Sequence, residues 1–444
     1  MSQTIESAIQ QLMQRHCGAG DVSACARLTG GATMESWRFD FGGDSFVLRR
    51  APSLEFMADR PFGHATEAAI IRTAYAAGVT APEVVTVLKH DDGLGSGFVM
   101  RALPGTPDPR QILGMEGSGI LLAEAARDLA RIHAIDRAEL PEDVPVMDYA
   151  VSLAGLREQF EEAGGDRPII ALGLKWLSNN LPNEIEPVLN HGDFRLGNIL
   201  AENSRLTGVL DWELAHFGDP HEDLAFGCMA VWRFARYDRP ALGLGTLEEY
   251  FAAYEAESGH AVDRERFRYW LIYRTVWWAL GCLRMAKIWR SGEDRMLERV
   301  VISRRTSEQE LDLLMLLEQD APEAVQSEQF YSEKPGESPG EASNGELAAA
   351  VCEWLETIKP LMEGHDRFQH AVARNALQMI FRDGITLPKS IDADLVRQIL
   401  AGEISLDSEG LLLRLRKDAL GKLAADVPKY PALAVARRKW TGEE

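Results

Sequence analysis

One stretch, residues 191–224, constrains this chain of 444 residues more than any other. It reads HGDFRLGNILAENSRLTGVLDWELAHFGDPHEDL and contains two short apolar runs on either side of a polar turn. This pattern is typical of a β-hairpin, in which we expect residues 198–202 to pair with residues 206–210. Because the start of one strand lies beside the end of the other, the hairpin is expected to bring Asn198 close to Asp211.

The polar residues of this stretch suit phosphoryl transfer. An amide oxygen from Asn198 and a carboxylate from Asp211 are ligands for a magnesium ion that is otherwise held by water and phosphates. Asp193 precedes them on a tight loop, where a carboxylate can accept a proton from an attacking hydroxyl or orient it. Phosphoryl transfer needs such parts, together with cations on the phosphates. The alternative is a set of polar residues that merely cap turns. It explains less well why four features occur together: the HGD sequence, an Asn five positions after its Asp, a β-hairpin, and an Asp at the end of the second strand.

The composition sets broad limits. The chain is long enough for more than one domain, and its hydrophobic fraction of 46% is ordinary for a globular protein. The net charge of −21 argues against a partner that is a nucleic acid or an anionic membrane. Five widely spaced cysteines without a CxxC pair fit neither a disulfide framework nor a zinc site. With no signal peptide or membrane span in the sequence, we expect a cytoplasmic protein.

The first hundred residues predict a small sheet. Trp37–Phe41 and Ser45–Arg49 alternate in polarity around a Gly-Gly-Asp turn, as a hairpin does. A second strand pair is expected at Val84–Leu88 and Phe98–Arg101. Before the hairpin, the backbone N–H groups of Gly30-Gly31 could lie over phosphates, although such a pair is more often an ordinary turn.

Arg49 and Glu67 are candidates for a nucleotide site. Along its strand Arg49 shares a face with Val47, which would direct Val47 to a base and Arg49 to phosphates. Glu67 lies on a helix predicted for residues 63–77 and could pair with Arg49. The alternatives are a solvated arginine at a strand end and a surface carboxylate. Met100 opens the segment that leaves the sheet through Pro and Gly, where a hinge is expected, and we include it among the cofactor-binding candidates.

The rest of the chain has helical periodicity. We expect a sheet-containing lobe at residues 1–104, a helical lobe with the catalytic loop at 105–319, a linker at 320–345 rich in Pro, Gly, Ser and acids, and a helical domain at 346–444. The helices of that domain are expected at Leu347–Ile358, Phe368–Phe381, Ala393–Leu400 and Leu411–Leu423. That last domain has no catalytic constellation. Three roles are open for it: docking a partner, self-association as a homodimer, or covering the acceptor site.

The motifs HGDFRLGNIL and GVLDWELAHFGDPHEDLA closely resemble those of the aminoglycoside/choline-kinase-like phosphotransferases. Within these, GGATMESWRFD, FVLRR and LARIHAID are similar to the branch whose kinase-like domains occur with acyl-CoA dehydrogenases. The resemblance covers roughly residues 20–310. It implies an α+β, bilobal protein-kinase-like fold, with a small β-rich N-lobe and a mainly helical C-lobe, that binds ATP and Mg²⁺ between the lobes. A separate all-α C-terminal domain is expected to follow, and the resemblance implies an acyl-CoA dehydrogenase as a candidate partner for it.

The resemblance also implies roles for residues. The family's catalytic base falls on Asp193, its metal ligands on Asn198 and Asp211, and its helix glutamate on Glu67. Its phosphate-binding lysine falls on Arg49, which is a departure, because a planar guanidinium is not interchangeable with an ammonium. Two further motif positions, Asp219 and Asp223, are interpreted as loop and helix-cap residues, and His133 is assigned no chemistry.

The acceptor is the least constrained part of the function. Residues 263–305 hold eleven cations and only five acids. The cations are Arg264, Arg266, Arg268, Arg274, Arg284, Lys287, Arg290, Arg295, Arg299, Arg304 and Arg305. A positive field there would favour an anionic acceptor, whereas the alternative is a solvated helix face of mixed charge. Because the resembling branch is associated with hydroxyacyl-CoA or hydroxy-acid substrates, we expect a kinase for such an acceptor. The other hypotheses are an aminoglycoside kinase and a nucleotide-binding, pseudokinase-like interaction module.

Overall fold

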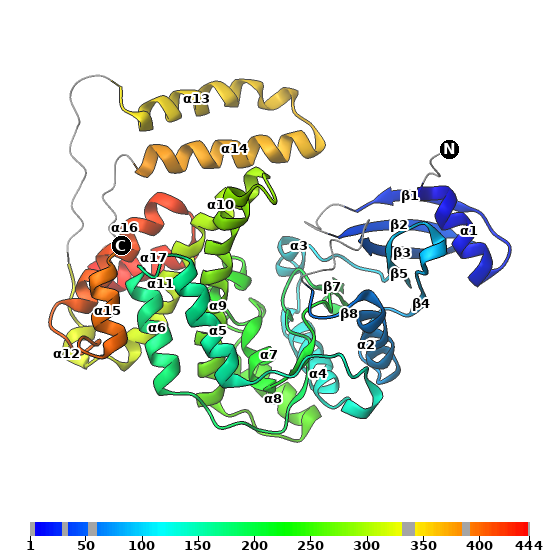
Figure 1. Ribbon diagram of the computed structural model, residues 1–444, viewed down its shortest axis with the longest axis horizontal. Helices are drawn as coiled ribbons and strands as arrows, with labels where there is room; N and C mark the ends of the chain where they lie inside the picture. Colours follow the sequence, from blue (N-terminus) through cyan, green and yellow to red (C-terminus); the bar gives the residue numbers. More distant parts are fainter. Residues whose placement is uncertain (1–4, 29–33, 52–59, 331–341, 384–390, 443–444) are drawn as a thin grey trace. The chain divides into compact units, whose positions relative to one another are not determined.

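Figure 1 shows the computed structural model of the chain, which describes residues 5–28, 34–51, 60–330, 342–383 and 391–442. The candidates Gly30 and Gly31 lie outside these residues. The chain forms two compact units. Unit 1 contains Met1–Asp148, Glu184–Phe234 and Asp238–Phe267, and unit 2 contains Tyr149–Asn183, Ala235–Tyr237 and Arg268–Glu444. The domain boundaries expected at residues 105, 320 and 346 stay predictions.

Unit 1 begins with an antiparallel five-stranded sheet of order β1-β2-β3-β5-β4. Its strands are β1 Val22–Arg27, β2 Glu35–Phe41, β3 Asp44–Ala51, β4 Val84–Val87 and β5 Ser96–Arg101. The four predicted strands correspond to β2–β5, and β1 is a strand that the sequence did not predict. At the β2–β3 turn, Gly42 and Gly43 have φ of +62° and +96°, values that glycine adopts without the steric cost of a side chain.

One face of this sheet is covered by α1 (Ile5–Cys17), which is seen beside it in Figure 1. The buried side of α1, including Ile9 and Leu12, packs in one hydrophobic cluster with Phe46 and Leu48 of β3. Strand side chains alternate between faces, so Arg49 points to the opposite face from Leu48. The strands therefore separate a hydrophobic face from a face that carries the charged site.

The remainder of unit 1 is mixed. Its helices are α2 His64–Ala76, α3 Pro109–Leu113, α4 Ser118–His133, α7 Pro220–Phe226 and α8 Leu247–Ser258, with short 3-10 turns η2 His90–Asp92, η3 Arg137–Glu139 and η4 Ala230–Arg233. Two small antiparallel sheets pair β6 Val188–Asn190 with β9 His216–Gly218, and β7 Ile199–Glu202 with β8 Arg205–Val209. The β7–β8 pair is the predicted hairpin. Its turn residues Asn203 and Ser204 both have positive φ, as a two-residue hairpin turn requires.

A short connection joins the five-stranded sheet to this hairpin. After β5, the backbone of Thr106 pairs with Ala201 of β7. Gly105 has φ of +98°, and a Cβ there would lie 2.5 Å from Oγ1 of Thr207. Only glycine lets the chain pass so close to the hairpin that carries Asn198.

Unit 2 is helical. Its helices are α5 Tyr149–Glu162, α6 Pro168–Asn179, α10 Leu297–Arg304, α11 Thr306–Leu317, α12 Glu323–Gln326, α13 Asn344–Ile358, α14 Gly364–Asp383, α15 Ala393–Ala401, α16 Leu411–Asp426 and α17 Pro431–Thr441, with turns η5 Glu318–Asp320 and η6 Lys359–Leu361. Most of the long helix α9 (Arg264–Ser291) also belongs to it. The four helices predicted after residue 346 correspond to α13–α16, whereas α17 was not predicted. No helix in the described ranges is both long and apolar enough to cross a membrane.

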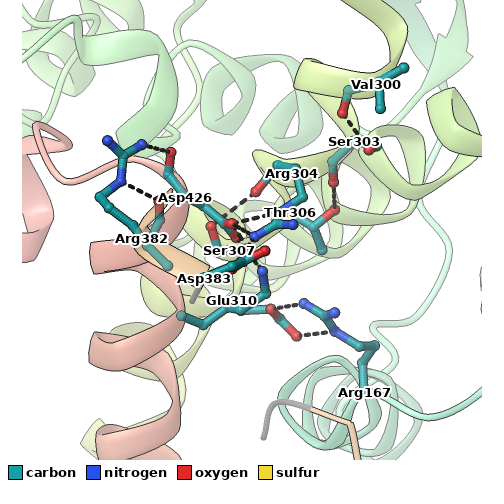
Figure 2. A network of polar contacts seen from close by, with 12 residues as sticks. Arg167, Val300, Ser303, Arg304, Thr306, Ser307, Glu310, Arg382, Asp383 and Asp426 are labelled. Carbon is teal, nitrogen blue, oxygen red and sulfur yellow. Dashed lines mark hydrogen bonds and ion pairs between the residues drawn. The ribbon is translucent and has the colours of Figure 1, made fainter. Parts of the chain in front are cut away.

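Ion pairs join the helices of unit 2 across long sequence distances. Figure 2 shows Arg304 of α10 with Asp383 at the end of α14 and Asp426 at the end of α16. The same view shows Arg167 in a two-bond contact with Glu310 of α11. Helix α15 packs on α6, and α16 packs on α11. The C-terminal helices are thus part of the same compact unit as α6 and α11.

Candidate active site

Helix α7 anchors the loop that carries Asp193 through two hydrogen bonds. A carboxylate of Asp223, in the first turn of that helix, accepts hydrogen bonds from the backbone N–H groups of His191 (2.6 Å) and Gly192 (2.9 Å). Gly192 has φ of +82°, and a Cβ there would lie 2.2 Å from the carbonyl oxygen of Leu214. Glycine at 192 is therefore required by both the turn and the packing, and the turn delivers Asp193 to one fixed place.

Asp223 is itself fixed in a buried polar cluster. His133 lies between it and Tyr254, with Nδ1 2.8 Å from the Tyr254 hydroxyl and Nε2 3.4 Å from Asp223 Oδ2. Burial would raise the pKa of Asp223, but the hydrogen bond and charges of His133 and His191 lower it overall. Asp219 caps α7 through the N–H of His221, in agreement with its predicted role. Asp223 instead accepts the N–H groups of His191 and Gly192 and so fixes the loop that carries Asp193.

Two side chains of the described residues donate three hydrogen bonds to the Asp193 carboxylate. Arg195 donates from Nε to Oδ1 (2.7 Å) and from Nη2 to Oδ2 (3.2 Å), and Asn198 Nδ2 donates to Oδ2 (2.6 Å). Burial raises the pKa of Asp193 to about 6, with Arg195 opposing the rise and Asp211 adding to it. A carboxylate with a raised pKa close to neutrality is suited to accept a proton.

Asn198 and Asp211 lie at the same end of the β7–β8 hairpin. The backbone N–H of Leu210 donates to the carbonyl oxygen of Asn198 at 2.7 Å, one step beyond the paired strands. Asp211 follows directly and has φ of +69°, a sparsely populated conformation for a residue with a side chain. Strain of this kind is common at functional sites. The hairpin geometry predicted from the sequence therefore holds for the backbone of both residues.

These residues leave oxygens for a cation. Asn198 uses its amide nitrogen on the carbonyl and carboxylate of Asp193, and Arg49 reaches only Oδ1 of Asp211. No described residue donates to Oδ1 of Asn198 or to Oδ2 of Asp211. One amide and one carboxylate oxygen fit the donor set of a magnesium ion that keeps its other ligands from water and phosphate.

Arg49 is surrounded by carboxylates. Its Nη2 donates to Asp211 at 2.8 Å and to Glu213 at 2.6 Å, and its Nε lies 3.2 Å from Glu67 Oε1. Burial would lower the pKa of Arg49, but the three carboxylates outweigh it and raise the pKa. The predicted pairing of Arg49 with Glu67 is present. Its additional contact with Asp211 links the sheet to the candidate metal ligand.

Glu67 is 4% exposed. Burial raises its pKa to about 7, Arg49 opposes that rise, and Asp211 and Glu213 add to it. The alternative interpretation of Glu67 as a surface carboxylate is therefore wrong, since the side chain lies inside the protein. Met100 lies on β5 between Val47 and Val84, on the strand that leads to the connecting segment.

Three residues that contact the site, Arg60, Arg195 and Glu213, were not predicted. Glu213 contacts Arg49 and Arg60, and Arg195 contacts Asp193. For Glu213 and Arg195 the only sequence signal is position, because Glu213 follows Asp211 by two residues and Arg195 follows Asp193 by two. Nothing in a single sequence distinguishes such a residue from a surface charge.

Most cations of the 263–305 region are already paired with acids. The pairs are Arg266–Asp219, Arg268–Asp320, Lys287–Glu162, Arg299–Asp294, Arg304 with Asp383 and Asp426, and Arg305–Glu308. This is the mixed-charge alternative named above. The region therefore gives little support to the expected positive field for an anionic acceptor.

Comparison with known proteins agrees with this chemistry. Residues 24–266, more than half of the chain, match the model of the phosphotransferase enzyme family. Acyl-CoA dehydrogenase family member 10 of Mus musculus is 31% identical over 254 residues, which cover 50% of this chain and 23% of that protein. Acyl-CoA dehydrogenase family member 11 of Gallus gallus is 30% identical over 203 residues, covering 42% and 25%. The matches thus span about a quarter of each relative's length.

A solved structure shares the fold. It is a Ralstonia eutropha protein provisionally assigned as an aminoglycoside phosphotransferase, with a TM-score of 0.57, 20% identity, and coverage of 70% of this chain and 97% of that one. This likeness confirms the predicted kinase-like class, a β-sheet region followed by mainly helical segments. The family match also confirms the predicted small-molecule kinase. The chain belongs to the phosphotransferase enzyme family.

Proposed function

We propose that this chain transfers the γ-phosphoryl group of ATP to a hydroxyl of a small acyl acceptor, either a hydroxyacyl-CoA or a hydroxy acid. The observation that carries the proposal is the arrangement of Asp193, whose carboxylate lies 2.6 Å from the amide nitrogen of Asn198. A proton acceptor next to oxygens suited to a cation is the core of a phosphoryl-transfer site.

Each residue has a role in this proposal. Asp193 accepts the proton of the acceptor hydroxyl. Asn198 and Asp211 hold Mg²⁺, which when bound neutralises charge on the phosphate oxygens. Arg49, oriented by Glu67, binds phosphate oxygens. Met100 contributes to the nucleotide site, as do Gly30 and Gly31, which lie in a part of the chain that the structure does not describe.

The choice of acceptor rests on the relatives. Both relatives reported above are named acyl-CoA dehydrogenase family members, which favours an acceptor from acyl-CoA chemistry. The paired cations of residues 263–305 do not add to this support. The solved structure shares only the fold at 20% identity, so it does not favour an aminoglycoside over an acyl acceptor.

Activity assays with a panel of acceptors test the proposal. The protein is incubated with Mg²⁺, ATP and either hydroxyacyl-CoAs, hydroxy acids or aminoglycosides, and the phosphorylated product is identified by mass spectrometry. Transfer to an acyl acceptor is expected. Transfer to aminoglycosides alone would replace the acceptor class, and ATP binding without transfer to any acceptor would favour the interaction module.

Asp193→Asn tests the catalytic assignment. Turnover should fall by about 100-fold to 10,000-fold, the usual contribution of a general base, while ATP affinity stays nearly unchanged. Asp91→Asn is the matched control, because the Asp91 side chain is 97% exposed and should leave turnover at the wild-type level. Unchanged turnover in Asp193→Asn would remove Asp193 from the role of base.

A further inference from the structure

Arg195 is the one side chain that contacts both oxygens of Asp193 among the described residues. Its Nε lies 2.7 Å from Oδ1 and its Nη2 lies 3.2 Å from Oδ2. A two-bond contact between a guanidinium and a carboxylate fixes the plane of both groups, as a single ammonium cannot. The contact spans only two positions in sequence, so it belongs to the loop itself.

The guanidinium is held on its other sides as well. Its central carbon lies 4.2 Å from the ring centre of Trp232, close enough for a cation–π contact. Nη1 donates to the carbonyl oxygen of Leu196 at 3.1 Å. A Cβ at Gly197 would lie 2.8 Å from Nη1, so glycine at that position leaves room for the group. Arg195 is therefore a pre-organised part of the loop and not a mobile surface cation.

The hydrogen bonds divide unequally between the two carboxylate oxygens. Among the residues that the structure describes, Oδ2 of Asp193 accepts from Arg195 Nη2 and from Asn198 Nδ2, whereas Oδ1 accepts only from Arg195 Nε. Each carboxylate oxygen has about two acceptor sites. Oδ2 is therefore filled, and Oδ1 keeps one direction for a further donor.

We propose that Arg195 is a positioning residue of the transfer reaction, which turns the open side of Asp193 Oδ1 toward the acceptor hydroxyl. The inference rests on the proposed function and deepens it. In the step, the proton of the acceptor hydroxyl passes to Asp193 Oδ1 as the acceptor oxygen bonds to the γ-phosphorus. The bond from that phosphorus to the bridging oxygen breaks, and its electron pair leaves with ADP. Arg195 takes part in no bond change and keeps the receiving oxygen in place.

Three arginine variants test the proposal through kcat and KM with Mg·ATP and the acceptor found in the panel. Arg195→Ala should lower kcat by about 100-fold, the loss that a misplacement near 1 Å can cause. KM should stay unchanged, as when an interaction made only in the transition state is lost. Arg195→Lys keeps the charge but not the fork, so it should recover little of the loss. Arg205→Ala, which removes an exposed arginine at the start of β8, is the control and should retain wild-type kcat.

Chemical rescue separates positioning from general damage to the fold. Ethylguanidine added to Arg195→Ala should restore part of kcat, because Trp232 and Asp193 can still hold a guanidinium between them. The rescue should disappear in Arg195→Ala/Trp232→Leu. If Arg195→Ala does not fold, Arg195→Lys carries the test alone.

Two results would overturn the inference while leaving the proposed function intact. One is a wild-type kcat in Arg195→Ala or Arg195→Lys, and the other is a reduced kcat in Arg195→Ala that ethylguanidine does not raise. A wild-type protein that transfers phosphate to no acceptor would be a different outcome. It would remove the proposed function, and the role of Arg195 would fall with it.

Discussion

At the scale of single residues, Arg49 shows what a guanidinium can do where the family resemblance implies a lysine. Its fork contacts Asp211 and Glu213 through one nitrogen and Glu67 through another. A compact ammonium could not present donors in this planar arrangement. The arginine therefore keeps the cationic character of the position and links Glu67 of α2 to the segment that carries Asp211 and Glu213.

Removing Arg49 should show how much the free energy of unfolding depends on the ion pair between Arg49 and buried Glu67. Arg49→Met should lower the free energy of unfolding by about 3 kcal/mol, because breaking a buried pair leaves one charge uncompensated. Arg49→Met/Glu67→Met should be more stable than the single variant. Arg101→Met, on the neighbouring strand with a side chain that is 45% exposed, should cost less than about 1 kcal/mol. Urea unfolding measures all three, and equal costs for the two arginines would contradict the argument.

Asp418 of α16 is expected to make the stability of unit 2 depend on pH. Burial raises its pKa to about 6, with Arg414 opposing and Asp392 and Glu310 adding to the rise. An unfolded aspartate titrates near pH 3.9, so the folded state binds more protons between the two values. The carboxylate therefore lowers stability as pH rises from about 4 to about 6, and the loss persists above that range.

Asp418→Asn should remove this loss. We expect the variant to have a higher melting temperature than the wild type at pH 8 and a similar one at pH 4, because asparagine stays neutral at both. Differential scanning fluorimetry across pH 4–8 measures the difference. Asp407→Asn, at an exposed position, should show no such trend. A gain that is the same at every pH would mean that charge is not its cause.

At the scale of elements, the first turn of α7 has two structural roles: it contains a helix cap, and it binds the loop that carries Asp193. Asp219 caps its start, and Asp223, in the same first turn, accepts the N–H groups of His191 and Gly192. The backbone N–H groups of a tight loop need partners when they are buried. The helix therefore supplies the acceptor that allows the loop with Asp193 to exist inside the protein.

Asp223→Asn should disturb both stability and turnover. An asparagine has one acceptor oxygen in place of two, so its NH₂ group would face one of the two loop N–H groups. Leaving a buried donor unsatisfied costs about 1–3 kcal/mol, and kcat should fall because Asp193 moves. Asp136→Asn, in an exposed cap of η3, is the control and should change little. Chemical unfolding and turnover assays give the two readings, and a loss of kcat without a loss of stability would contradict the explanation.

At the scale of the whole molecule, the C-terminal helices complete unit 2. Glu318 is fully buried and accepts hydrogen bonds from Arg416 of α16 and from Lys439 and Trp440 of α17. The polar residues of α11 are buried as well, and Asp312 among them accepts a hydrogen bond from the Tyr430 hydroxyl. Buried acids are tolerated only with such partners. Helices α16 and α17 therefore supply the partners that the buried acids of α11 and η5 require.

A chain that ends at residue 345 should consequently fail to form unit 2. Without Arg416 and the residues of α17, Glu318 would lose the hydrogen bonds from Arg416, Lys439 and Trp440, and we expect no cooperative melting and little near-UV circular dichroism. In the full chain, Arg416→Met should cost about 3–5 kcal/mol, as for other broken buried pairs. Arg397→Met, on the surface of α15 with 77% of its side chain exposed, should be nearly neutral. Cooperative melting of the shortened chain at the full-length temperature would contradict this dependence.

The sequence by itself determined the local parts of this protein. The β7–β8 hairpin, four strands of the first sheet and most helices follow from residue periods and turn residues, which act over a few positions. The hairpin also determined that Asn198 and Asp211 lie together, because their approach depends on strand pairing alone. The strand β1 and helix α17 were not predicted.

The tertiary structure decided how the local parts are joined. Arg49 contacts Asp211 across 162 positions, and the acids of α11 and η5 meet their cations on α16 and α17. Spacing along the chain carries no information about such pairs, because folding and not sequence distance brings them together. It also decided that most cations of residues 263–305 are neutralised. A count of charges cannot show this, since a charge creates a field only where no opposite charge lies beside it.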